Sequence, residues 1–453
     1  MDQSFMKERP IFPLVLAMSI PNVLSMLVNS LYNIVDSFFV AKISEDAMTA
    51  ISLVFPIQNI NLAIAVGFSI GLNALIAFLL GMGQEEKASQ AATVGMVMCV
   101  VHGFILMVTC IAILPRFLGM FSDNQEVVSM GIRYCVIVLM FGIPHHLYIG
   151  MEKVYQALGK MKTCMLAMML GCITNIILDP VLIFGIGPFP AMGIAGAAIA
   201  TGIGQFISLL YYVVSYFVKP IPIKFSRKNL KFEKSILTRM YGVGIPASLT
   251  MALPSLLIST LNRILAAYSQ VYIVVLGIYY KLQTFVYMPA NGLIQGIRPL
   301  VGYNFGAKED RRVKKIYNVS LLLSIGMMCI GTVICFIFPE NLMGMFSTNA
   351  ETIKAGGAAL AIISIGFIPS SVSITSCGAL EGLGMGVQSL MISLLRYTVV
   401  IIPTAFILCR SFGPSGVWHA FWITEVITAV VAYILYERVV SKSKIKREIK
   451  EQE

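Results

Sequence analysis

The chain has 453 residues, of which 57% are hydrophobic and 12% charged, whereas a soluble domain carries about 25% charged residues. Its mean hydropathy is +0.83. This composition excludes a water-soluble globular domain. The net charge of +11 does not indicate nucleic acid, because no stretch has the pattern of a DNA- or RNA-binding module. We therefore expect an integral membrane protein without a nucleic-acid partner.

Twelve predominantly apolar segments follow one another along the chain, each long enough to cross a bilayer. They cover residues 11–40, 47–80, 90–114, 127–150, 160–185, 191–218, 235–267, 272–303, 313–338, 351–377, 386–409 and 414–438. The runs are too long and too unbroken for the alternating strands of a membrane barrel. The predicted fold class is an all-α integral membrane protein with twelve transmembrane helices in two homologous six-helix lobes.

The two lobes follow from an internal repeat at an offset of 225 residues. Gln58, Gly67 and Gly71 return with identical spacing as Gln283, Gly292 and Gly296. The four residues 119–122 return unchanged at 344–347, and Ile-Pro at 20–21 returns at 245–246. In a chain this apolar, such a repeat is typical of carriers that hold their substrate between two homologous lobes.

The repeat and the charge pattern together predict four regions. Residues 1–218 form an N-terminal six-helix lobe, 219–234 a basic cytoplasmic linker, 235–438 a C-terminal six-helix lobe and 439–453 a charged cytoplasmic tail. If the N-terminus is cytoplasmic, the inner loops and tail hold 24 of the 33 basic residues and the outer loops hold 4. This ratio obeys the positive-inside rule, so we expect a multi-pass protein of the cell membrane with both termini cytoplasmic.

Motifs for soluble chemistry are missing from the sequence. The nine cysteines lie inside predicted spans without metal-site spacing, and we interpret them as small buried hydrophobes. No Ser-His-Asp or zinc pattern occurs, and the glycines at 81–83 lack the Gly-Lys-Ser/Thr of a phosphate loop. We therefore expect no enzyme activity, no cofactor and no direct use of ATP.

Two carboxylates lie inside predicted spans, where charge is costly and is a functional candidate by default. Span 1 places Asp36 about 6 Å below its outer end, at about 1.5 Å per residue, and span 5 places Asp179 at a similar depth. Asn175 lies one turn deeper on the same face as Asp179, and Ala197 and Thr201 share one face of span 6. Their oxygen atoms are ligands that suit a hard cation, and two nearby carboxylates favour a shared proton.

Structural explanations exist for each carboxylate alone. Asp179 followed by Pro180 is a good helix start, so Asp179 would then only begin a new helix after a break. Asp36 would lie at headgroup level if span 1 ended early. The repeat argues against scaffolding, because the positions equivalent to Asp36 and Asp179 in the second half hold Leu261 and Thr404.

The sequence resembles the multidrug and toxic compound extrusion (MATE) family, and within it the bacterial DNA-damage-inducible-F-like branch. The resemblance rests on the six-plus-six repeat, on Val-Asp-Ser-Phe-Phe at 35–39, on Gln58 and on Asn-Ile-Ile-Leu-Asp-Pro at 175–180, and it extends to about Tyr436. It implies a secondary active antiporter that expels lipophilic, often cationic, compounds in exchange for H⁺ or Na⁺. Asp36, Asn175, Asp179 and Thr201 would bind Na⁺ if the exchange is sodium-coupled.

A substrate cleft between the lobes would be lined by aromatic, polar and flexible side chains. The candidates are Tyr32, Phe55, Gln58, Lys281, Gln283 and Met288. Methionine suits a promiscuous surface, although most of the 27 methionines have the simpler role of apolar filling. We interpret Glu425, beside Thr424 and Thr428, as a hydrogen-bonding group between helices.

Two other functions compatible with the sequence are a flippase for a lipid-linked saccharide and a non-transporting membrane scaffold. A flippase requires a strongly cationic cleft for a pyrophosphate, and only Lys281, Arg263 and Arg298 are available. A scaffold predicts no vectorial flux and no effect of Asp36→Asn. Our prediction is the antiporter, acting as a monomer on lipophilic or cationic small molecules in contact with membrane lipid.

Overall fold

The structure is a computed structural model that describes the backbone of residues 3–452 and the side chains of residues 3–441. Helices account for all of the regular structure in that part of the chain. Contacts between Cα atoms divide the chain into two compact units. Within the described residues, unit 1 contains residue 3 and residues 24–248, and unit 2 contains residues 4–23 and 249–452.

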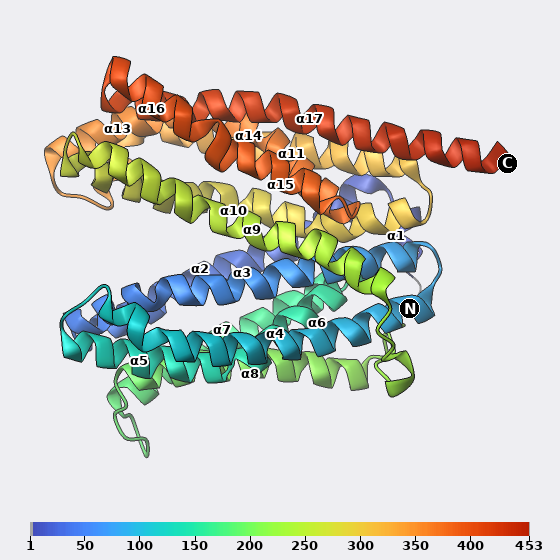
Figure 1. Ribbon diagram of the computed structural model, residues 1–453, viewed down its shortest axis with the longest axis horizontal. Coiled ribbons are helices and arrows are strands. Elements are labelled where there is room, and N and C mark those ends of the chain that lie inside the picture. Colours follow the sequence, from blue (N-terminus) through green and yellow to red (C-terminus); the bar gives the residue numbers. More distant parts are fainter. Residues whose placement is uncertain (1–2, 453) are drawn as a thin grey trace. The chain divides into compact units, whose positions relative to one another are not determined.

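Unit 1 is built from long helices that run alongside one another, coloured from blue to green in Figure 1. Its helices are most of α2 (Ile11–Ala41), α3 (Glu45–Gly81), α4 (Glu85–Gly119), α5 (Gln125–Met140), α6 (Gly142–Ala157), α7 (Met161–Phe184), α8 (Ile194–Val218), the 3₁₀ turn η1 (Arg227–Asn229) and the beginning of α9 (Lys234–Ala266). A buried apolar cluster from α2, α3, α4, α5, α7 and α8 includes Val54, Leu114 and Ala197.

Unit 2 repeats this plan with more interruptions. Its elements are α1 (Phe5–Glu8), the beginning of α2, the rest of α9, α10 (Gln270–Gly306), α11 (Asp310–Ile337), α12 (Pro339–Gly344), α13 (Ala350–Ser364), α14 (Phe367–Gly382), α15 (Gly386–Leu394), the π-helical segment η2 (Leu395–Val399), α16 (Ile401–Phe412) and α17 (Pro414–Gln452). The largest core cluster of this unit includes Leu261, Phe367 and Trp418.

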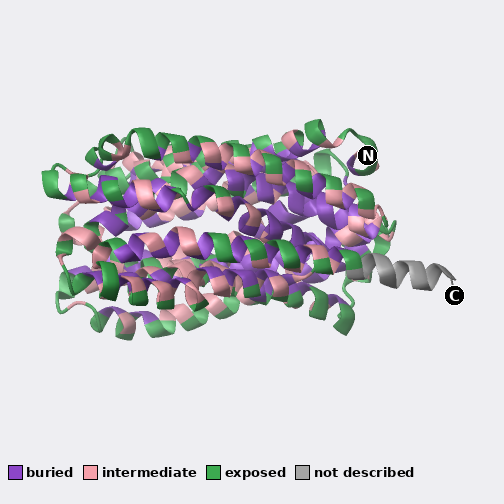
Figure 2. Cartoon of the chain, turned by 90° about the horizontal axis from the view of Figure 1, so that it is seen from above, coloured by how far each residue is buried: buried purple, intermediate pink, exposed green. Residues whose placement is uncertain are grey.

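The helices bear out the predicted fold class. Ten are long and apolar enough to cross a membrane, and two bent pairs raise the total to 12 when each pair is counted as one span, within the described residues. The pairs are α5 with α6, bent by 49°, and α13 with α14, bent by 54°. Buried and exposed residues alternate around the helices in Figure 2, and many exposed side chains are large and apolar. Such surfaces suit lipid, so the chain is a multi-pass membrane protein.

The strongest sequence repeat proves to be a pair of helix caps. The Asn124 side chain accepts hydrogen bonds from the backbone of residues 126 and 127, at 2.9 and 3.4 Å. Asn349 does the same for residues 351 and 352, at 2.9 and 3.2 Å. In each motif the preceding serine, Ser122 or Ser347, accepts from the asparagine N–H at 3.2 Å. The repeat therefore begins α5 and α13 in the same way, since side-chain oxygens satisfy the first free N–H groups of a helix.

Tight turns with left-handed backbone also recur at the 225-residue offset. Gly159 and Gly384 have φ of 71° and 78°, and Gly83 with φ of 72° corresponds to Lys308 with φ of 62°. Glycine adopts this conformation without steric cost, whereas lysine does so rarely. The turn after α10 therefore keeps the shape of the turn after α3 although its sequence has lost the glycine.

Close helix contacts explain why the beginning of α9 belongs to unit 1 and the beginning of α2 belongs to unit 2. In unit 1, a Cβ added at Gly67 or Gly71 of α3 would collide with the backbone of α9 at Ser248 or Met240. In unit 2, Gly292 and Gly296 of α10 meet α2 at Val23 and Met18 in the same manner. Paired glycines four residues apart let two helices approach closely within a membrane. The predicted lobe boundary at 219–234 stays a prediction. The boundaries between the two compact units lie inside α2, after residue 23, and inside α9, after residue 248.

The segments before α9 and α2 are each attached to their unit by polar contacts. Residues 219–234, the predicted linker, contact α4 of unit 1, where Gln90 donates to the Lys231 carbonyl and to Glu233, both at 2.9 Å. In unit 2, Asn304 donates to the carbonyl of Met6 at 3.1 Å, and Lys7 lies 3.2 Å from Glu309. The side chains of the predicted tail, residues 439–453, lie outside the described residues from 442 onward.

Candidate functional site: a carboxyl pair inside unit 1

Asp36 lies within a helix and not beyond its end. Helix α2 is continuous from Ile11 to Ala41, so Asp36 precedes its last residue by five positions. The side chain is partly buried, and its Oδ1 atom is buried without a hydrogen-bond partner. A carboxylate that ended its helix at headgroup level would be hydrated. This one is held among helices, as the functional interpretation requires.

Asp179 also lies inside a helix, because α7 runs unbroken from Met161 to Phe184 with Pro180 in its interior. The interpretation in which Asp179 begins a new helix does not describe this structure. Proline has no N–H, so the carbonyl group of residue 176 lacks its usual helical partner at this point. The Asp179 side chain is 0% exposed, and its Oδ1 atom has no partner.

The two carboxyl groups meet in space. The side chains of Asp36 of α2 and Asp179 of α7 lie close enough to interact directly. Asn175, one turn before Asp179 and 2% exposed, connects this pair to α8. With its amide oriented to satisfy both ends, Asn175 donates to Asp179 Oδ2 and accepts from the backbone N–H of Thr201, each at 2.9 Å. Four predicted residues are thus brought together from three helices.

Further side chains extend the cluster to α3 and α5. Tyr32, one turn before Asp36, and Tyr134 of α5 each lie within electrostatic range of both carboxyl groups. Thr201 lies near Tyr32, and Gln58 of α3 lies near Tyr134. Tyr134 was not predicted from the sequence, because a single tyrosine in an apolar span carries no distinguishing signal. Ala197, predicted to be one of the cation-coupling residues, is fully buried in the apolar core of unit 1.

This geometry allows the cluster to hold a proton or a small cation. Two neighbouring carboxylates repel each other, and a proton shared between them would remove that repulsion. The unpaired oxygens, Asp36 Oδ1 and Asp179 Oδ1, are also acceptors that a hard monovalent cation would satisfy. Among the described residues, no group of three or more His, Cys, Asp or Glu side chains gathers around a common point. The donor set therefore fits H⁺ or Na⁺ better than a transition metal.

The residues predicted to line a substrate cleft have different degrees of exposure. Phe55 and Lys281 are exposed, whereas Tyr32, Gln58 and Gln283 are partly buried. Met288 is only 5% exposed and is enclosed within unit 2. The Lys281 ammonium lies 5.8 Å from the centre of the Phe346 ring, a cation–π contact.

Unit 2 contains a buried charged centre that sequence reasoning identified only in part. Glu425 of α17 was interpreted as a helix–helix hydrogen-bonding group, but it forms an ion pair with Arg396 of η2, with Nε and Nη2 at 2.7 and 2.6 Å from Oε1. Both residues are 8% exposed. Arg396 also donates to the hydroxyl of Tyr287 at 3.3 Å, and Glu425 Oε2 is left unpaired. The π-helical segment that positions Arg396 has no obvious sequence signal.

A second type of buried ionic group occurs in both units. In α6, Lys153 lies 3.0 Å from Glu152 and donates to Gln156 at 3.0 Å, although the positive-inside count treated Lys153 as a loop residue. In unit 2, Arg298 pairs with Glu381 at 2.6 Å. Gln156 and Glu381 are equivalent positions of the repeat. Each group neutralises its own charge, so neither offers an isolated charge to a ligand.

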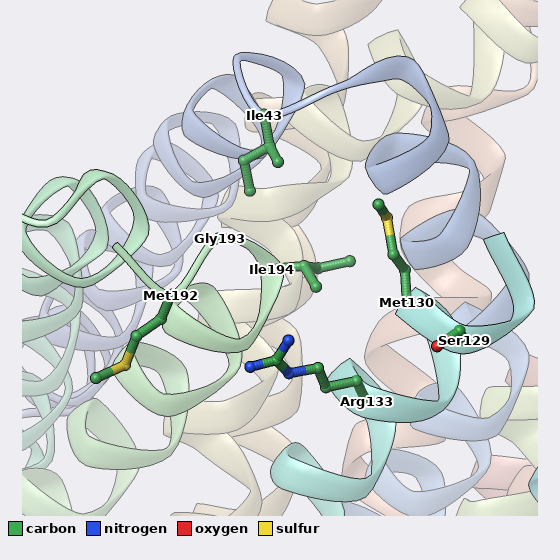
Figure 3. A pocket seen from close by; sticks show the side chains of 7 residues that line it. All are labelled: Ile43, Ser129, Met130, Arg133, Met192, Gly193 and Ile194. Carbon is green, nitrogen blue, oxygen red and sulfur yellow. The ribbon is translucent and has the colours of Figure 1, made fainter. Parts of the chain in front are cut away.

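A small pocket of about 210 Å³ opens in unit 1 near the ends of α2, α5 and α8 (Figure 3). Its lining includes Ile43, Met130, Arg133 and Met192. The Arg133 side chain extends into the space between the surrounding elements. None of the predicted site residues lines this pocket, so it is separate from the carboxyl pair.

The fold and the site together define a class of protein: an α-helical membrane carrier built from an internal repeat, with a buried carboxyl pair in its first half. The MatE family profile matches residues 21–181 and 246–407, two blocks that start 225 residues apart. The chain belongs to this family.

Curated relatives match over nearly the whole chain. The multidrug export protein MepA of Staphylococcus aureus is 25% identical over 433 residues, which cover 95% of this chain and 94% of MepA. MepA of Staphylococcus saprophyticus is 26% identical over 432 residues, with the same coverage.

Solved structures share the fold. A MATE crystallised in complex with MaL6 superposes with a TM-score of 0.92 at 21% identity, covering 98% of this chain and 99% of that one. An outward-facing multidrug resistance MATE transporter of the MOP superfamily gives the same TM-score and identity, with 98% of each chain covered. A MOP superfamily transporter from Pyrococcus furiosus, whose binding pocket is described as having reverse polarity, also has a TM-score of 0.92.

Proposed function

We propose that this chain is a secondary active multidrug efflux transporter of the cell membrane, which exchanges lipophilic or cationic compounds for H⁺ or Na⁺. Membership of the MatE family and similarity to the multidrug export protein MepA support the transport activity. The observation that carries the ion coupling is the pair Asp36–Asp179, two neighbouring carboxyl groups that lie among helices and are left with two unpaired oxygens.

The carboxyl pair would couple ion binding to conformation. A ligand shifts a conformational equilibrium only by its different affinity for the two states. A proton or cation on Asp36 and Asp179 removes the repulsion between two carboxylates and satisfies their free oxygens, so it stabilises the arrangement in which α2 and α7 are in contact. Loss of the ion would favour a state in which these helices separate and the site is exposed.

Efflux from vesicles tests this function when a pH gradient and a Na⁺ gradient are imposed separately. We expect one gradient to drive export and Asp36→Asn and Asp179→Asn each to abolish it, because both remove a charge with little change in volume. Asp123→Asn is the matched control, since Asp123 is exposed in the loop before α5. Normal gradient-driven efflux in both variants would contradict the proposed site.

The variant Asn175→Leu distinguishes coupling to Na⁺ from coupling to H⁺. The change removes an amide that connects Asp179 to α8 but removes no titratable group. A Na⁺ site should lose affinity sharply, whereas a proton shared between two carboxyl groups should be affected less. Equal loss of transport with either gradient would show that Asn175 acts on the geometry of the site.

The flippase remains a less favoured alternative. Of its three candidate basic residues, Arg298 is neutralised by Glu381 at 2.6 Å. A scaffold protein would show no flux under any gradient in the same vesicles.

A further inference from the structure

A groove of unit 2 lies between the ends of α9 and α16 and has a volume of about 600 Å³. One wall comes from the last turns of α9, including Thr260 and Ile264, and from Ala267 directly after the helix. The other comes from α16, including Ile402 and Phe406. Tyr268 donates a hydrogen bond to the carbonyl of Cys409 at 3.1 Å and so connects the two walls. The lining is mostly apolar and is accessible from the surface of the unit.

Two arginines are among the residues that line this groove. Arg263 is three residues before the end of α9, and Arg410 is two residues before the end of α16. Both side chains are exposed, and neither has an acidic partner within the described part of the chain. The Arg410 guanidinium lies 4.3 Å from the centre of the Phe406 ring, which orients it over the apolar wall.

The position of these charges is unusual for this chain. The end of unit 2 where α9 and α16 finish is the one predicted to face outward, and the predicted outer loops hold few basic residues. In the first half of the repeat, the equivalent positions are Phe38 and Gly185, so the helix plan does not require a charge at either place. A pair of guanidinium groups above an apolar groove matches a molecule with an anionic head and a hydrocarbon tail.

We propose that this groove binds an anionic phospholipid, with the phosphate at Arg263 and Arg410 and an acyl chain along the wall formed by Ile264 and Phe406. Guanidinium groups bind phosphate through paired hydrogen bonds, and the absence of acidic side chains from the lining leaves the positive charge available. This site is distinct from the carboxyl pair of unit 1, and it does not depend on the ion that drives transport.

Native mass spectrometry of the purified full chain tests the site, with dioleoyl phosphatidylglycerol and dioleoyl phosphatidylcholine as competing probes. We expect a preference for phosphatidylglycerol that falls about fivefold in Arg263→Gln or Arg410→Gln and about 25-fold in the double variant, from roughly 1 kcal/mol per basic residue. Arg133→Gln, the exposed arginine of the pocket in unit 1, is the matched control and should keep the preference.

A second variant tests the groove without altering charge. Ala267→Trp fills the space between the two walls and should displace the bound phosphatidylglycerol while both arginines remain. An unchanged preference in the double glutamine variant, or an equal loss in Arg133→Gln, would overturn the site. The Ala267→Trp variant keeps Arg263 and Arg410. If these two arginines bind inorganic phosphate in that variant, the site is one for free anions, and the proposal is overturned.

Discussion

Removing Arg396 should destabilise unit 2 more than most single substitutions. Arg396→Met keeps the length of the side chain but leaves Glu425, 8% exposed, without the two donors at 2.7 and 2.6 Å that now neutralise it. Its second oxygen is already unpaired, so the whole carboxylate would be buried without compensation. Breaking one side of a buried ion pair costs about 3–5 kcal/mol, and we expect a loss of that size.

The assay uses the only two tryptophans of the chain, Trp418 and Trp422, which lie within two turns of Glu425 on α17. Their fluorescence should report the unfolding of unit 2 in detergent. The double variant Arg396→Met/Glu425→Leu removes both charges and should recover most of the stability, because replacing an entire buried pair by apolar groups is often nearly neutral. A single variant within about 1 kcal/mol of the native protein, or a double variant whose loss equals the sum of the two single losses, would refute this account.

Three other substitutions have expected outcomes that stability measurements can check. Gly71→Val should destabilise the protein by about 1–3 kcal/mol or more, because any Cβ at this position of α3 collides with the Met240 carbonyl of α9. Gly119→Ala is the control and should be tolerated, because a Cβ there has no neighbour within 4 Å. Equal losses of stability in the two variants would exclude the close-contact explanation. Asn349→Ala should cost about 1 kcal/mol by removing the cap of α13, and an unchanged unfolding midpoint would contradict this. Lys153→Met should cost about 3 kcal/mol or more by leaving Glu152 buried without its cation, and stability like that of the native chain would show that Glu152 becomes neutral or hydrated.

The long helices could be predicted from the sequence because the bilayer demands continuous apolar segments. The predicted span at 11–40 is α2 at 11–41, and the predicted span at 272–303 is α10 at 270–306. The carboxyl pair could also be predicted from the sequence, because charge inside a span is rare and the depth of a residue along a helix follows from the residue count. Asp36 and Asp179 therefore meet, although their helices are far apart in sequence.

Breaks within spans and the partners of buried charges were missed by the sequence analysis. The span predicted at 127–150 bends after Met140 and continues as α6 to Ala157. Pro144 has no N–H to donate to the Met140 carbonyl, so it was an available signal for this break that the prediction of one continuous span did not use. The π-helical segment η2 was not predicted either. Pairing such as Arg396 with Glu425 depends on helix rotation and on how neighbouring helices pack, and an apolar span without strong periodicity leaves both undetermined.

The contrast between the two units supports placing the ion coupling in unit 1. The repeat puts Gly171 and Ala200 of unit 1 at the positions of Arg396 and Glu425, close to the contact between Asn175 and Thr201. In unit 2 the carboxylate is neutralised by a guanidinium that is permanently charged and covalently attached, so it does not require an exchangeable ion. In unit 1 the described partners of Asp36 and Asp179 include no basic side chain. Under the proposed function, a proton or an external cation would neutralise those two carboxyl groups, as ion-driven transport requires.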